Sequence, residues 1–145
     1  KNVLIGVAGQ TPLWRRLIGS VRSDDYMGGM EMLEAVGLID LAQQKVDKMS
    51  GGERQRIAIA RSLVHGAQLV LTDEPVSGLD PHSSEEMMRT LKKLCAEKGT
   101  TIVAALHRLE LAEKFADEIW GMQDGRIVLQ VKGRRLTAAE KLRIT

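Results

Sequence analysis

Two short stretches of this sequence hold residues that could act on a phosphate group. The first is Ser50-Gly51-Gly52-Glu53, an S-x-x-E capping-box pattern with two glycines where a helix is expected to begin. Glycine has no Cβ, so a ligand can approach the backbone amides, and the positive end of the helix dipole attracts anions. On these residues alone, an ordinary helix start is the more common interpretation.

The second stretch runs from Leu69 to Glu74 and ends in Asp73-Glu74-Pro75. Its short apolar, β-branched run, bounded by Gly66 and Pro75, predicts a buried strand. Open α/β sheets bind their ligands at the C-terminal ends of the strands. The two carboxylates therefore stand where such a sheet would place a ligand.

Helices and strands alternate after residue 50, which predicts a parallel α/β sheet followed by an antiparallel hairpin. The expected elements are a helix from Ser50 to about Val64, the strand 69–73, a helix from Pro81 to Gly99, a buried strand 101–106 before His107, a helix 109–116, strands 118–122 and 127–131 joined at Asp124-Gly125, and a short helix opened by the capping box Thr137–Glu140. In the first of these helices we expect five residues to face inward: Ile57, Ala58, Ala60, Leu63 and Val64.

The first third of the chain is expected to be helical, with helices at 13–18 and 24–36 and a helical turn at 39–43. The composition is that of a soluble globular protein, with 43% hydrophobic and 28% charged residues, and the net charge of +2 does not indicate a nucleic-acid partner. Cys95 is the only cysteine, which excludes an intrachain disulfide. Because the chain starts with Lys1, we expect it to begin within a longer protein.

Four motifs in order resemble those of the ATP-binding-cassette (ABC) ATPases: Ser50-Gly51-Gly52-Glu53, the strand ending in Asp73-Glu74-Pro75, Ser77-Gly78-Leu79-Asp80, and the strand that precedes His107. The resemblance implies a P-loop NTPase-like α/β fold with a partial parallel sheet. Residues 1–66 would be a helical subdomain that carries the signature motif, and residues 67–145 the C-terminal part of the RecA-like ATPase core.

The resemblance also assigns a role to each motif. Ser50, Gly51, Gly52 and Glu53 match the signature motif, which in this family binds the γ-phosphate of ATP held by a second subunit, so two copies sandwich two nucleotides. Asp73 matches the Walker B aspartate that holds Mg²⁺ through its water shell.

Three further residues follow from the same comparison. Glu74 would polarise the attacking water as general base, and His107 resembles the switch histidine that contacts the γ-phosphate. Asp80 matches the D-loop aspartate that touches the opposite subunit, although its capping of the next helix needs no partner.

The main departure from the family is that no G-x-x-x-x-G-K-[ST] phosphate loop (Walker A) occurs in the sequence. The aromatic residue that stacks on adenine and the Q-loop glutamine have no counterpart either. We therefore expect a C-terminal fragment without the Walker A strand, inactive by itself. The absence of that strand should leave a gap in the sheet that exposes backbone edges and apolar side chains. Such a gap favours pairing with another copy or marginal stability.

The stretches 2–6 and 9–17 resemble the ATPase subunit of bacterial phosphonate importers. This resemblance implies a peripheral protein on the cytoplasmic face of the inner membrane. Residues 1–48 would contact transmembrane permease subunits, and ATP hydrolysis would drive import of a solute, with phosphonate as the candidate.

Two other interpretations remain open. The C-terminal ATPase lobe of a DNA-repair or chromosome-maintenance ABC protein would also lack Walker A, but heptads should precede it, and residues 1–48 contain Pro12 and no sustained heptad. A degenerate interaction module that does not hydrolyse ATP is disfavoured because Asp73, Glu74 and His107 are all present.

Overall fold

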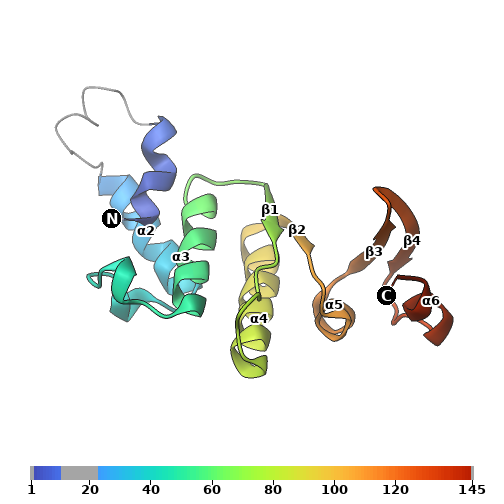
Figure 1. Cartoon of the computed structure of the whole chain (residues 1–145). Helices are drawn as coiled ribbons and strands as arrows, with labels where there is room; N and C mark the ends of the chain where they lie inside the picture. Colours follow the sequence, from blue (N-terminus) through green and yellow to red (C-terminus); the bar gives the residue numbers. More distant parts are fainter. Residues whose placement is uncertain (1, 11–22, 145) are drawn as a thin grey trace. The chain divides into compact units, whose positions relative to one another are not determined.

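The computed structural model describes residues 2–10 and 23–144, which belong to two compact units, Lys1–Ala105 and Leu106–Thr145 (Figure 1). The helix expected at 13–18 lies outside the described residues. No helix in the described ranges combines the length and the apolar character needed to cross a membrane.

The first unit begins with helices that pack around one another (Figure 1). These are η1 (Val3–Gln10), α2 (Ser23–Ala35), η2 (Ile39–Leu41), η3 (Val46–Lys48) and α3 (Gly51–Leu63). α2 and α3 pack against each other and against η1. In α3 the inward positions expected for Ile57, Ala60 and Leu63 are confirmed, but Ala58 is exposed and Ile59 is buried instead.

Two parallel strands complete the first unit. β1 (Leu69–Asp73) and β2 (Thr101–Ala105) pair in register from Leu69↔Thr101 to Asp73↔Ala105. The connection between them is α4 (Pro81–Lys98), which packs against β2 and ends at Gly99 in the left-handed region at φ 63°. The predicted strand 69–73 and the parallel pairing are therefore confirmed.

The expectation that both strands are buried is wrong. Val70 is buried, but Leu69, Leu71 and Val103 are 56%, 74% and 40% exposed. Successive side chains of a strand point to opposite faces of its sheet, so these three lie together on the face opposite Val70. A continuous apolar run does not show whether one or both faces are covered.

The second unit contains α5 (Leu109–Phe115), the antiparallel strands β3 (Glu118–Gln123) and β4 (Arg126–Lys132), and α6 (Ala138–Ile144). Asp124 and Gly125 join the strands with φ values of 49° and 73°, as a two-residue hairpin turn requires. The hairpin is a sheet separate from β1 and β2. α6 packs on it, with Ile144 against the bare Cα of Gly121.

Ionic contacts hold α6 at its start. Thr137 and Glu140 form the predicted capping box, and Arg134 donates two hydrogen bonds to the Glu140 carboxylate, at 2.9 and 2.7 Å. The bonds from Arg134 and then the Thr137 backbone N–H lower the pKa of Glu140 from 4.5 to about 2. A depressed carboxyl pKa stabilises the fold above the unfolded value, and this contribution is lost as the pH falls through the folded value.

We predict that the Glu140 carboxyl titrates near pH 2 and that the amides of α6 lose protection as it is protonated. The measurement is an NMR pH titration of the side-chain carboxyl and of the Lys141–Ile144 amides. Arg134→Gln should move the midpoint toward 4.5, since the first cause of the shift is removed. A midpoint near 4.5 in the unsubstituted chain would contradict the observed ion pair.

The exposed side chains of the β1–β2 sheet generate a second prediction. Leu71→Lys should weaken self-association of the chain by roughly tenfold, because a leucine side chain contributes about 1.5–3 kcal/mol when it is buried. Folding stability should change by less than about 0.5 kcal/mol at this exposed position. Sedimentation velocity at several concentrations measures the self-association of the variant and of the unsubstituted chain.

The matched control is Leu142→Lys in α6, whose side chain is 82% exposed. It introduces the same charge on a different element, in the second unit, and should leave association unchanged. A chain that is monomeric at every concentration, before any substitution, would rule out self-pairing through this face.

Candidate functional site

The start of α3 has the geometry that the capping-box pattern predicts. The Ser50 hydroxyl accepts a hydrogen bond from the Glu53 N–H at 3.3 Å, and Glu53 Oε2 accepts one from the Ser50 N–H at 2.7 Å. These two bonds leave the N–H groups of Gly51 and Gly52, in the first turn, outside the capping box. A Cβ added at Gly51 would meet no atom within 4 Å, so the space in front of the helix is open to a ligand.

A carboxylate shares this helix start. Hydrogen bonding to the backbone N–H and the hydroxyl of Ser50 lowers the pKa of Glu53, and Arg56 lowers it further. Glu53 is therefore ionised at neutral pH and opposes the binding of an anion at the amides of Gly51 and Gly52. The helix dipole and the open amides act in the other direction.

Glu53→Gln tests this balance, because glutamine can close the same capping box without the charge. We predict that inorganic phosphate binds roughly three to ten times more tightly to the variant, the size expected for one unit charge acting at close range through water. The amide shifts of Gly51 and Gly52 during an NMR titration measure the affinity. Unchanged or weaker binding would show that phosphate does not occupy this helix start.

The two carboxylates follow β1 as predicted. Asp73 ends the strand and is exposed, and Glu74 comes next, half-buried, with a φ of 43° in the left-handed region. Its N–H donates to the carbonyl of Ala105 at 3.1 Å, which extends the β1–β2 ladder by one step. A non-glycine residue in this conformation carries strain of about 1–2 kcal/mol, so the surrounding contacts must hold it.

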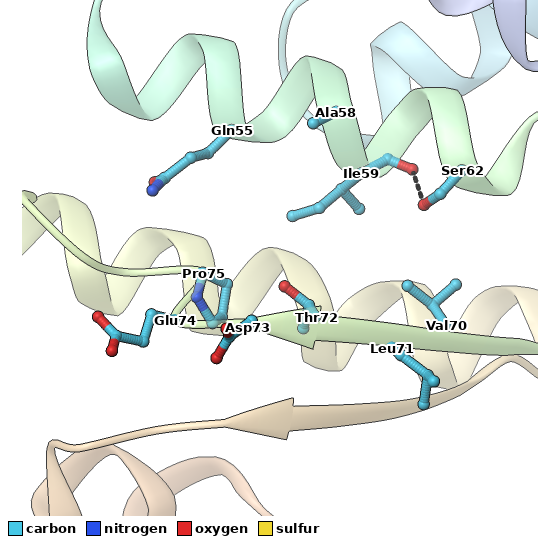
Figure 2. Close-up of a pocket in the computed structure, with 10 residues that line it drawn as sticks. All are labelled: Gln55, Ala58, Ile59, Ser62, Val70, Leu71, Thr72, Asp73, Glu74 and Pro75. Atoms are coloured by element: carbon cyan, nitrogen blue, oxygen red, sulfur yellow. Dashed lines mark hydrogen bonds between the residues drawn. The ribbon is translucent and has the colours of Figure 1, made fainter.

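A pocket of about 250 Å³ lies between α3 and β1 and reaches the two carboxylates (Figure 2). The lining side chains come from α3, from β1 and from the turn that follows β1. The lining residues are Gln55, Ala58, Ile59, Ser62, Val70, Leu71, Thr72, Asp73, Glu74 and Pro75.

The loop after Glu74 contacts the start of α3. Gln55 Nε2 donates to the Ser77 carbonyl at 3.3 Å, and a Cβ on Gly52 would lie 3.4 Å from Leu79 Cδ2. The first unit thus brings the signature stretch next to the Ser77–Asp80 stretch, although they are far apart in the sequence. Asp80 caps α4 by accepting from the N–H groups of His82 and Ser83 at 3.0 and 3.1 Å, and hydrogen bonds, chiefly with Ser83, lower its pKa.

His107 lies two positions beyond the last residue of β2 and is exposed. It belongs to the second unit, whereas Asp73, Glu74, Asp80 and the signature stretch belong to the first. Its approach to the γ-phosphate stays a prediction.

Asp73 is compatible with Mg²⁺ in chemistry and in position. Mg²⁺ in nucleotide sites keeps several waters and takes one or two protein carboxylates along with phosphate oxygens, and Asp73 presents an exposed carboxylate at a strand end. Among the described residues no three His, Cys, Asp or Glu side chains gather into a metal-binding group. A hydrated Mg²⁺ held by one carboxylate needs no such group.

Sequence reasoning missed Gln55 and Leu79, which connect α3 to the carboxylate loop. The sequence spacing between Gln55 and Ile59 could have indicated the direction in which Gln55 faces. Gln55 stands four residues before Ile59, and residues four apart share a helix face. Gln55 therefore had to face the same neighbour as Ile59, which is β1.

The sequence around this site is similar to a known protein family. The model of the ABC transporter family matches residues 7–77, which include the signature stretch and both carboxylates. Residues 7–77 are therefore similar to the ABC transporter family.

Curated relatives extend the similarity beyond that segment. The "Phosphonates import ATP-binding protein PhnC" of Thiobacillus denitrificans is 44% identical over 141 residues, 94% of this chain and 53% of the relative. The protein of the same name from Maricaulis maris is 41% identical over 128 residues, 88% of this chain and 48% of the relative. The chain spans about half the length of these relatives.

Solved structures show the same fold. A putative metal-chelate type ABC transporter in an inward-facing conformation matches with a TM-score of 0.80 at 26% identity, covering 90% of this chain and 50% of that one. A bacterial ABC transporter cassette solved as a dimer matches with a TM-score of 0.71 at 29% identity, covering 92% and 56%. The chain has part of the P-loop NTPase-like fold of ABC ATPases, as the motifs predicted.

Proposed function

We propose that this chain is the signature-bearing part of the ATP-binding subunit of an ABC importer, which couples ATP binding and hydrolysis to solute uptake. The observation that carries the proposal is the contact between the α3 start and the loop after Glu74. One packed unit therefore carries both the amides for the phosphate of a nucleotide held by a second subunit and the carboxylates for Mg²⁺ and water at its own nucleotide, as a two-subunit sandwich requires.

Each group has a role in that reaction. The stretch Ser50–Glu53 meets the γ-phosphate of ATP held by a second subunit: the amides of Gly51 and Gly52 and the Ser50 side chain bind it, and Glu53 holds the helix start in place through the capping box. Asp73 holds the hydrated Mg²⁺, which would neutralise charge on the phosphates. Glu74 accepts a proton from the attacking water, and His107 steadies that water.

The relatives support the proposed partners and location. The dimeric cassette and the two-sided nucleotide site of the family support a homodimer, in which Asp80 faces the second subunit. The PhnC relatives are named for phosphonate import, which supports phosphonate as the solute, permease subunits as membrane partners, and a position at the cytoplasmic face of the inner membrane. We assign residues 1–66 to the helical subdomain that meets the permease and residues 67–145 to the ATPase core.

We predict that the 145-residue chain alone neither binds Mg-ATP tightly nor hydrolyses it, because its sequence contains no G-x-x-x-x-G-K-[ST] loop to supply most phosphate contacts. Isothermal titration calorimetry and phosphate release measure both properties. Turnover that disappears in Glu74→Gln would show that the chain is active alone and that this prediction is wrong.

The proposed trans role can be tested with a relative that does carry a nucleotide. Fluorescently labelled chain is mixed with the PhnC protein of Thiobacillus denitrificans, Mg²⁺ and a non-hydrolysable ATP analogue, and association is followed by sedimentation velocity. We expect association that requires the analogue. Gly51→Asp should weaken it by at least tenfold, since a carboxylate would face the γ-phosphate, while the open space at Gly51 leaves the fold intact.

The control is Gly28→Asp in α2, where an added Cβ also meets no atom within 4 Å. It introduces the same charge away from the proposed site and should preserve association. Association that is independent of the analogue, or equally weakened by both substitutions, would overturn the proposed role of the signature stretch.

A further inference from the structure

The turn that carries Glu74 is held at one residue, Ser77. The Ser77 N–H donates to the Glu74 carbonyl at 3.0 Å and closes the turn around the strained glutamate. The Ser77 carbonyl accepts from Gln55 Nε2 at 3.3 Å. Ser77 is therefore hydrogen-bonded to Glu74 through its N–H and to α3 through its carbonyl.

The orientation of the Gln55 amide is set by its partner. The Ser77 carbonyl can only accept a hydrogen bond, so the Nε2 side of the amide must face it. The Oε1 atom is then buried, and among the described residues it is the one buried side-chain nitrogen or oxygen without a hydrogen-bond partner. A buried acceptor without a donor destabilises a fold.

This arrangement gives Gln55 a role other than stability. A methionine of similar length would fill the same space beside Pro75 without the buried Oε1, and the carbonyl of the exposed Ser77 would bond to water instead. What the glutamine contributes is the bond to Ser77. Figure 2 shows the Gln55 side chain extending from α3 toward the segment of Glu74 and Pro75. The second contact between the same two segments, Leu79 against Gly52, involves the residue at the phosphate-binding helix start itself.

We propose that Gln55 is a positioning residue for Glu74. Through Ser77 it fixes to α3 the turn that carries Glu74, so that the Glu74 carboxylate keeps its position at the end of β1. Glu74 is the positioned group because of its proposed role as general base, and in this respect the inference rests on the proposed function.

The test compares the chain with Gln55→Met by amide hydrogen exchange, by the NMR shifts of Glu74 and by thermal melting, all without nucleotide. We expect the amides of Ser77 and Leu79 to exchange about fivefold faster, the factor that corresponds to loss of one ordinary hydrogen bond. The Glu74 shifts should move away from left-handed values. The melting temperature should stay about the same, because the removal of the buried Oε1 offsets the loss of the bond to Ser77.

The matched control is Gln44→Met. Gln44 Nε2 also donates to a backbone carbonyl, that of Lys48 at 3.2 Å, away from the carboxylate turn. It should leave the exchange of Ser77 and Leu79 and the shifts of Glu74 unchanged.

A merely structural glutamine would lower the melting temperature and speed exchange evenly through α3 and α4, and that result would overturn the proposal. If the amides of Ser77 and Leu79 exchange at the same rate in Gln55→Met as in the unsubstituted chain, the proposal is overturned as well. Neither result bears on the trans nucleotide site, which the association experiment with Gly51→Asp tests separately.

Discussion

The parallel pairing of β1 with β2 is the constraint on which the site depends. The ladder ends at Asp73↔Ala105 and continues for one further bond, from the Glu74 N–H to the Ala105 carbonyl. Asp73 ends the strand and is exposed, and the chain turns immediately after this last bond. Glu74 takes a left-handed conformation in consequence, and the loop that follows is brought back against α3.

The start of α3 balances two opposing electrostatic effects. Open amides and the helix dipole attract an anion, while the ionised Glu53 that completes the capping box repels it. The same side chain therefore stabilises the helix and limits the affinity of the site for phosphate.

Local patterns predicted most elements but not their surroundings. The strand 69–73, the capping box at Ser50 and the Asp124-Gly125 hairpin turn depend on residues close in sequence, so their chemistry could be recognised there. The exposure of Leu69 and Leu71 depends on what covers each face of the sheet, which an apolar run does not specify.

The site shows the same division. The residues of Ser50–Glu53 and the Asp73-Glu74 pair were identified from motifs, whereas Gln55 was not, because its role depends on a bond to Ser77, 22 residues away. The sequence also predicted Ala58, and not Ile59, to be buried in α3, for a similar reason. The helix faces β1 on a side that the spacing of apolar residues alone did not define.

The most direct measurement of the central claim is a crystal structure of this chain bound to a relative loaded with an ATP analogue and Mg²⁺. We predict that the γ-phosphate accepts hydrogen bonds from the N–H groups of Gly51 and Gly52, with Asp80 at the same interface. A nucleotide that contacts neither glycine, or an interface formed by a different surface of the chain, would contradict the proposed role of the α3 start.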